Sequence, residues 1–130
     1  MSLPAQGYEG KKVVHLVERV TVKGPGGEEM VRAKVDTGAD RTTVDRRLAE
    51  RLKLGPPLSH VAIKASAEGR VVQRPVVDAV VTVGGKSFDL RVGVADRSQM
   101  KFLVIIGRDI LRSGSFLIDP SRRKKTRPAA

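Results

Sequence analysis

Apolar and polar residues alternate along several short stretches of the chain, and turn-forming residues separate these stretches. A period of two is typical of strands that bury one face. The turns at 23–27 and 84–85 are rich in glycine, and Gly84-Gly85 favours a two-residue hairpin. The pattern therefore predicts strands at 13–22, 30–35, 76–83, 88–94, 103–106 and 116–118, and a projecting hairpin over 58–72 with its tip at 65–70.

The helical signals are few. Asp45 is a good N-cap for a short helix over 46–54, in which Leu48 and Leu52 share one face, and Gly55-Pro56-Pro57 ends it. A second short helix is predicted at 108–111. The fold class is therefore mostly β with one or two short helices. We expect a single domain over 11–120, between a flexible N-terminal lead (1–10) and a basic C-terminal tail (121–130).

Composition supports a β core. Hydrophobic residues make up 40% of the chain, yet it has one Tyr, three Phe and no Trp, so Val, Leu and Ile must form the core. The chain has no Cys, which excludes disulfides and cysteine-based zinc sites and favours an intracellular setting. We see no signal peptide and no apolar stretch of membrane-spanning length. We expect a cytoplasmic protein that does not contact a membrane.

The net charge of +11 raises the question of nucleic-acid binding. Five of the basic residues lie in the tail after Asp119, where no acidic residue follows, and the other basic residues are scattered. Aromatic side chains for base stacking are almost absent. A basic nucleic-acid-binding β domain rests on charge alone, so we expect only nonspecific contact by the tail.

The candidate chemistry lies in two segments. Asp36-Thr37-Gly38-Ala39 follows the apolar stretch 30–35, so a carboxylate is placed at the end of a strand. Later, Ile105-Ile106-Gly107 ends a second apolar stretch and is followed by Arg108. An acid before glycine is also a common turn former. The second segment shifts the balance toward a functional loop, because a strand that ends at glycine can cradle the first loop.

These two segments resemble the retropepsin family, the single-domain aspartic proteases of retroviral type. The matching residues are 35–40 and 104–111, and the resemblance spans about 13–119. It implies a closed β barrel or sandwich that acts as a homodimer, and an aspartic endopeptidase that cleaves peptide or protein substrates. A subgroup labelled ATP-dependent zinc proteases looks similar through 96–101 and 116–121.

The resemblance also implies roles for individual residues. Asp36 is the expected catalytic residue, and Thr37, Gly38 and Ala39 support it. Asp40 and Arg108 are expected to form an ion pair near the dimer interface, with the carboxylate partly buried. Substrate contacts are expected from Gly38, Asp40 and the hairpin tip, which is similar to a flap and contains Ser66, Glu68 and Gly69.

Elementary chemistry agrees with a dimer. Aspartic proteolysis needs two carboxylates that share one proton, and this chain offers one Asp-Thr-Gly. A two-fold dimer supplies the second. No cofactor and no metal are expected, because His15 and His60 are the only histidines, they lie far apart, and the chain has no P-loop. The alternative is a non-catalytic peptide- or partner-binding module on the same dimeric fold.

Overall fold

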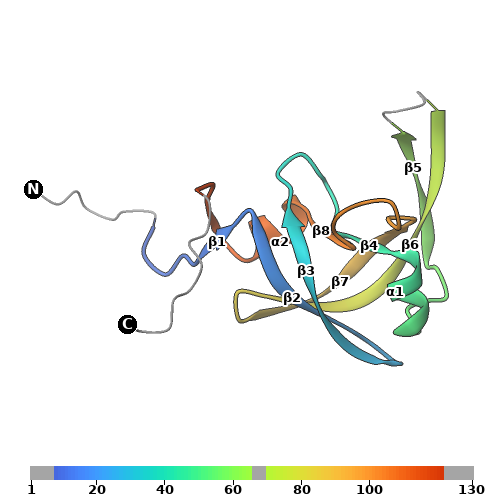
Figure 1. Cartoon of the computed structure of the whole chain (residues 1–130), viewed down its shortest axis with the longest axis horizontal. Coiled ribbons are helices and arrows are strands. Elements are labelled where there is room, and N and C mark those ends of the chain that lie inside the picture. Colours follow the sequence, from blue (N-terminus) through green and yellow to red (C-terminus); the bar gives the residue numbers. More distant parts are fainter. Residues whose placement is uncertain (1–7, 66–69, 122–130) are drawn as a thin grey trace, which may run out of the picture.

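The computed structural model describes residues 8–65 and 70–121, and the elements follow one another from blue to red in Figure 1. Strands dominate, and two helices of six residues each accompany them. The elements are β1 (Val13–His15), β2 (Val17–Gly24), β3 (Gly27–Val35), β4 (Thr43–Asp45), α1 (Arg46–Arg51), β5 (Ser59–Ala65), β6 (Arg70–Val83), β7 (Lys86–Ala95), β8 (Val104–Ile106), α2 (Arg108–Ser113) and β9 (Leu117–Asp119).

Six of these strands form a closed barrel. Their order is β2-β3-β8-β4-β7-β6, and pairing of β2 with β6 through Thr21 and Thr82 closes the ring. β5 pairs with β6 outside the ring, while β1 and β9 form a separate parallel pair. The predicted fold class, mostly β with a closed barrel and short helices, is confirmed.

The barrel interior is filled by small aliphatic side chains. Both helices contribute to this core. Leu48 of α1 and Leu52 just after it are buried there, as are Ile110 and Leu111 of α2. Each fully buried aliphatic side chain contributes about 1.5–3 kcal/mol relative to exposure. The fully buried valines of this core are Val14, Val20, Val22, Val44, Val81, Val83, Val92 and Val104.

Two local predictions hold in detail. Gly84 and Gly85 both have positive φ (57° and 80°), the conformation that a two-residue turn of type I′ requires and that glycine adopts without strain. Asp45 caps α1, since its side chain accepts a hydrogen bond from the Arg47 backbone N–H. Its carboxylate is almost fully buried and also accepts the Arg97 N–H at 2.7 Å.

Other boundaries differ from those predicted. The strand over 13–22 is two strands separated at Leu16, whose carbonyl accepts the Val35 N–H instead. The helix predicted over 46–54 ends at Arg51, and Lys53 has a positive φ. β4 was not predicted, because a three-residue strand is too short to show a period. β6 runs unbroken through Pro75, which lies opposite His60 of β5.

The β5–β6 hairpin projects from one end of the barrel (Figure 1). Its strands pair from Ser59 opposite Val76 to Ala65 opposite Arg70. The tip residues expected to contact substrate, Ser66, Glu68 and Gly69, lie outside the described residues. Within the described ranges, no helix has the length and apolar character needed to span a bilayer.

Candidate active site

Asp36 lies where β3 leaves the barrel. β3 runs parallel to β8, and the Asp36 backbone N–H donates to the Ile106 carbonyl at 2.9 Å. The Asp36 carboxylate is partly exposed, and its Oδ1 accepts the Gly38 N–H at 2.9 Å. A Cβ at position 38 would lie 3.2 Å from that oxygen, so glycine leaves the carboxylate room. The loop therefore fixes the acid and presents it to solvent.

The loop is closed against the start of α2. The Ala39 N–H donates to the Asp36 carbonyl at 3.2 Å, and the Ala39 carbonyl accepts the Arg108 N–H at 2.8 Å. At position 107 a Cβ would come within 2.9 Å of the Ala39 carbonyl oxygen and 2.8 Å of the Arg41 carbonyl carbon. Backbone atoms cannot yield easily, so this close approach requires Gly107.

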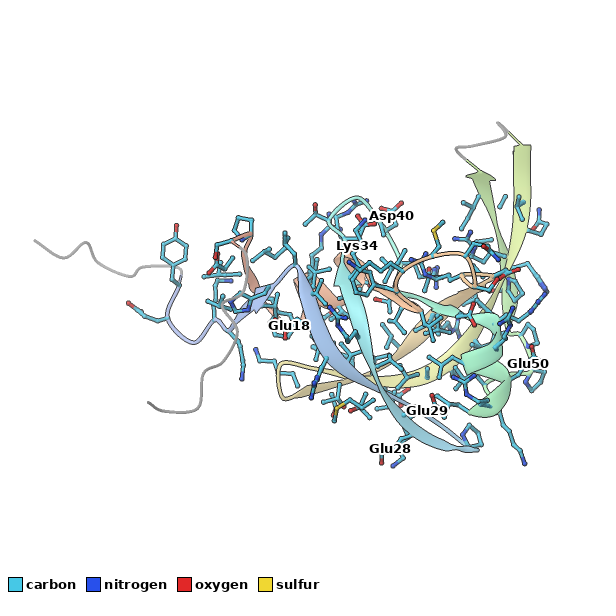
Figure 2. The ribbon with its side chains drawn as sticks, viewed as in Figure 1. Glu18, Glu28, Glu29, Lys34, Asp40 and Glu50 are labelled. Atoms are coloured by element: carbon cyan, nitrogen blue, oxygen red, sulfur yellow. The ribbon has the colours of Figure 1, made fainter. Side chains whose placement is uncertain are left out.

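Arg108 connects the helix to the same loop. One guanidinium nitrogen donates to the Thr37 carbonyl at 2.6 Å, and the other forms an ion pair with Asp40. Figure 2 labels Asp40 on the loop between β3 and β4. The Asp40 side chain is 91% exposed and that of Arg108 is 32% exposed. The Asp40 carboxylate is therefore exposed in the single chain, and its partial burial near the dimer interface stays a prediction.

A second network, which the sequence did not reveal, holds the other end of the loop. Asp109 accepts hydrogen bonds from the Thr42 backbone N–H at 2.9 Å and from the Thr42 hydroxyl at 2.7 Å. The buried hydroxyl of Thr42 in turn accepts the Gly107 N–H at 3.1 Å. No local pattern indicates this contact, because the two residues lie 67 positions apart in the sequence.

A cleft of about 510 Å³ lies between the Asp36 loop and the hairpin. Gly38 and Asp40 line it, as predicted for substrate contacts, together with Ala39 from the same loop. The opposite wall is formed by Val61 and Ile63 of β5. The other lining residues are Arg41, Thr43, Ala62, Arg74 and Ile105.

Two partly buried arginines lie near this cleft. Burial lowers the pKa of Arg74, which lines the cleft from β6. Burial also lowers the pKa of Arg97, with a smaller contribution in the same direction from the charge of Arg74, while the carboxylates of Asp36 and Asp45 act to raise it. The Arg97 Nε donates to the Phe102 carbonyl at 2.9 Å. Arg97 therefore lies close enough to Asp36 for the two charges to interact.

The described residues do not form a metal centre. His15 lies on β1, with its ring 3.3 Å from Glu18 and 3.8 Å from Asp119, whereas His60 is exposed on β5. No three potential metal-ligating side chains gather within the described ranges. The donor set does not fit the zinc site that the label of the similar subgroup implies, and we derive no step through a metal.

A closed six-stranded barrel with an acid-bearing loop beneath a short helix defines a retropepsin-like protein. Residues 19–110 match the aspartyl protease family, and the chain belongs to that family. The match contains residues 35–40 and all but the last residue of 104–111, the two segments on which the resemblance rests. No curated protein matches the sequence.

Solved structures share the fold at low sequence identity. The EIAV protease, solved with an inhibitor, has a TM-score of 0.60 and 24% identity over 78% of this chain and 88% of its own. A Legionella pneumophila protein of unknown function has a TM-score of 0.56 and 17% identity, over 84% and 93%. The simian foamy virus protease has a TM-score of 0.51 and 17% identity, over 73% and 92%.

Proposed function

We propose that this protein is a homodimeric aspartic endopeptidase in which Asp36 of each chain supplies one half of the active site. The observation that carries the proposal is the position of Asp36. A backbone-anchored loop holds the carboxylate partly exposed, next to a cleft with an apolar wall. Membership of the aspartyl protease family supports the same conclusion.

The dimer follows from the number of acids. The chain has one Asp-Thr-Gly, and the reaction needs two carboxylates close together. Thr37 and Gly38 are exposed in the single chain, so the tip of the loop is free to meet a second copy. We assign the Thr37 hydroxyl to a hydrogen bond across the two-fold axis, where it holds the two loops in register.

The chemistry divides between the two carboxylates. The ionised Asp36 removes a proton from water as the water oxygen forms a bond to the scissile carbonyl carbon. The protonated Asp36 of the other chain donates its proton to the carbonyl oxygen, which gives a neutral tetrahedral diol. Collapse of the diol breaks the C–N bond as the dyad gives its proton to the leaving amine. One diol hydroxyl returns a proton to the dyad, which releases the carboxylic acid and restores the single shared proton.

The substrate is an extended peptide or protein segment in the cleft. Gly38 leaves space for its backbone to approach the acid, and Asp40 lies at the rim of the cleft. Val61, Ile63 and Ile105 offer apolar contacts to its side chains. We retain Ser66, Glu68 and Gly69 as proposed contacts from the hairpin tip.

The test is cleavage of a peptide library by the purified protein, with Asp36→Asn as the matched control. Asn keeps the shape of the side chain and loses the base, so we expect turnover to disappear while dimerisation persists. The rate should be bell-shaped in pH, because a dyad with two protons lacks a base and one with none lacks an acid. Cleavage by both proteins contradicts the assignment of Asp36. Cleavage by neither favours the binding module.

Dilution tests the assembly. Activity per chain should fall when the protein concentration is reduced below the dissociation constant of the dimer. Thr37→Ala should move that fall to a higher protein concentration. A stranded donor or acceptor costs about 1–3 kcal/mol. A sedimentation experiment that finds a fully active monomer overturns the shared site.

A further inference from the structure

One edge of β7 has no partner strand. β7 pairs with β6 from Lys86 to Gly93, and with β4 only over Gly93–Ala95. In the part of the chain that the structure describes, no strand pairs with the stretch from Lys86 to Val92 on the side away from β6. An unpaired edge offers a row of free N–H and C=O groups to another extended chain.

The direction of these groups follows from the pairing. The Gly93 N–H donates to the Thr42 carbonyl at 2.9 Å, so the backbone of Gly93 points away from β6. Successive residues of a strand point their backbone groups to opposite edges. The N–H and C=O groups of Ser87, Asp89 and Arg91 therefore point to the open edge.

An open hollow of about 590 Å³ runs along this edge. Ser87, Asp89 and Arg91 line one side, while Ile110 and Ser113 of α2 line the other. The helix therefore stands beside the edge without pairing with it. The space is available to a polypeptide in extended conformation.

The hollow adjoins the proposed active cleft. Asp40 and Arg41 line both. A substrate chain that extends from the cleft across these two residues would meet the edge of β7. This proximity to the cleft points to the substrate itself as the occupant.

We propose that the edge of β7 from Ser87 to Arg91 is a docking site that binds an extended segment of the substrate, remote from the scissile bond, as an added strand. The inference rests on the proposed protease function. Main-chain hydrogen bonds supply most of the binding in such strand addition, and side-chain pairs supply selectivity. Arg91 lies 4.0 Å from Asp78 of β6, whereas Asp89 has no ion-pair partner among the described residues. A basic residue opposite Asp89 completes the site.

The test compares peptide lengths. A short peptide from the cleavage library is extended at one end or the other by a segment of about ten residues that includes lysine. Such a segment is longer than the roughly 17 Å that the five strand residues of the docking site span. We expect one extended peptide to have a kcat/KM about tenfold higher, equivalent to about 1.4 kcal/mol. Equal values for short and extended peptides overturn the docking site and leave the protease proposal intact.

Two variants locate the effect. Asp89→Pro removes an N–H that points away from β6, so the β6–β7 ladder keeps its bonds. It should reduce the kcat/KM of the extended peptide to that of the short one and leave the short peptide unchanged. Asp89→Ala keeps the backbone N–H and should retain part of the increase in kcat/KM that the extended peptide shows. A full gain in Asp89→Pro contradicts strand addition, and thermal unfolding checks that the variant is folded.

A binding measurement separates this proposal from the protease function. The extended peptide is added to labelled Asp36→Asn protein, and the backbone amide signals of Ser87, Asp89 and Arg91 are followed by NMR. We expect them to shift and to become protected from exchange. If wild type cleaves no peptide, the protease proposal fails while these signals still decide the docking site. Unchanged signals at saturating peptide overturn it.

Discussion

The Asp36 loop and the β5–β6 hairpin form opposite walls of one cleft, yet they are supported very differently. The loop is bonded to β8 and α2 through Ile106, Arg108 and Asp109. The hairpin strands pair with each other, and no apolar residue of β5 belongs to the buried core of the described structure. The protein therefore holds its acid by a network tied to the barrel and leaves the facing wall to its own ladder. Stability and substrate recognition should be separable by mutation.

The largest loss of stability should come from Asp109→Ala. The change removes the acceptor of two hydrogen bonds from Thr42. It also leaves the Thr42 hydroxyl, which accepts the Gly107 N–H, without the carboxylate that orients it. Donors left without partners in the interior cost about 1–3 kcal/mol each, so we expect a total of about 2–4 kcal/mol. Urea denaturation measures it, with the exposed Asp78→Ala as control. Equal losses in both variants would show that the network is unimportant.

A smaller effect should distinguish the two contacts of Arg108. Asp40→Ala removes an exposed ion pair and should cost less than about 1 kcal/mol. Arg108→Ala also removes the bond to the Thr37 carbonyl, so about 1–3 kcal/mol is expected. Arg108→Lys should recover only part of this, because an ammonium lacks the planar fork that reaches both acceptors. A double-mutant cycle that gives strong coupling to Asp40 would indicate burial of the pair.

On the hairpin side, Ile63→Ala should change activity more than stability. Ile63 is only partly buried but lines the cleft, so its truncation removes contacts to bound peptide. We expect a several-fold lower kcat/KM, since a few methylenes are worth about 1–3 kcal/mol in a pocket, and almost no change in the melting temperature. Val71→Ala, on the same hairpin and 67% exposed, is the control. A large fall in melting temperature would show that the hairpin supports the barrel.

The smallest effect concerns pH, at a place remote from both walls. The Arg51 guanidinium donates two hydrogen bonds to Glu29 and holds the pKa of that carboxyl below its usual value. Because the folded pKa is depressed, the stability from this pair is present above the unfolded value of about 4.3 and is lost as pH falls through the folded pKa. Wild type should therefore exceed Glu29→Gln slightly at pH 7 and equal it in strong acid. Glu28→Gln is the control, and urea midpoints across pH measure both.

The sequence predicted the parts of the fold that depend on local chemistry. Gly84-Gly85 marked a hairpin because only glycine adopts two consecutive positive φ values easily. Asp45 marked the start of α1 because its side chain satisfies a free N–H. The apolar stretches before Asp36 and Gly107 predicted the two strands that meet at the loop, and these strands do pair.

The sequence could not predict features that depend on distant contacts. The bond between Thr42 and Asp109 needs the barrel to close before the two residues meet. The cleft arginine at position 74 was indistinguishable from any other surface charge. The exposure of Asp40 depends on what covers the loop, and no local pattern encodes that.

The length of β6 has a mechanical consequence. Fourteen residues run without interruption from the hairpin into the barrel, about 45 Å of extended chain. Its first half pairs with β5, and its second half closes the ring against β2. β6 therefore connects the hairpin wall of the cleft directly to the barrel seam at Thr82, although the hairpin end of the strand pairs only with β5. We therefore expect substitutions at this seam, far from Asp36, to alter the width of the cleft.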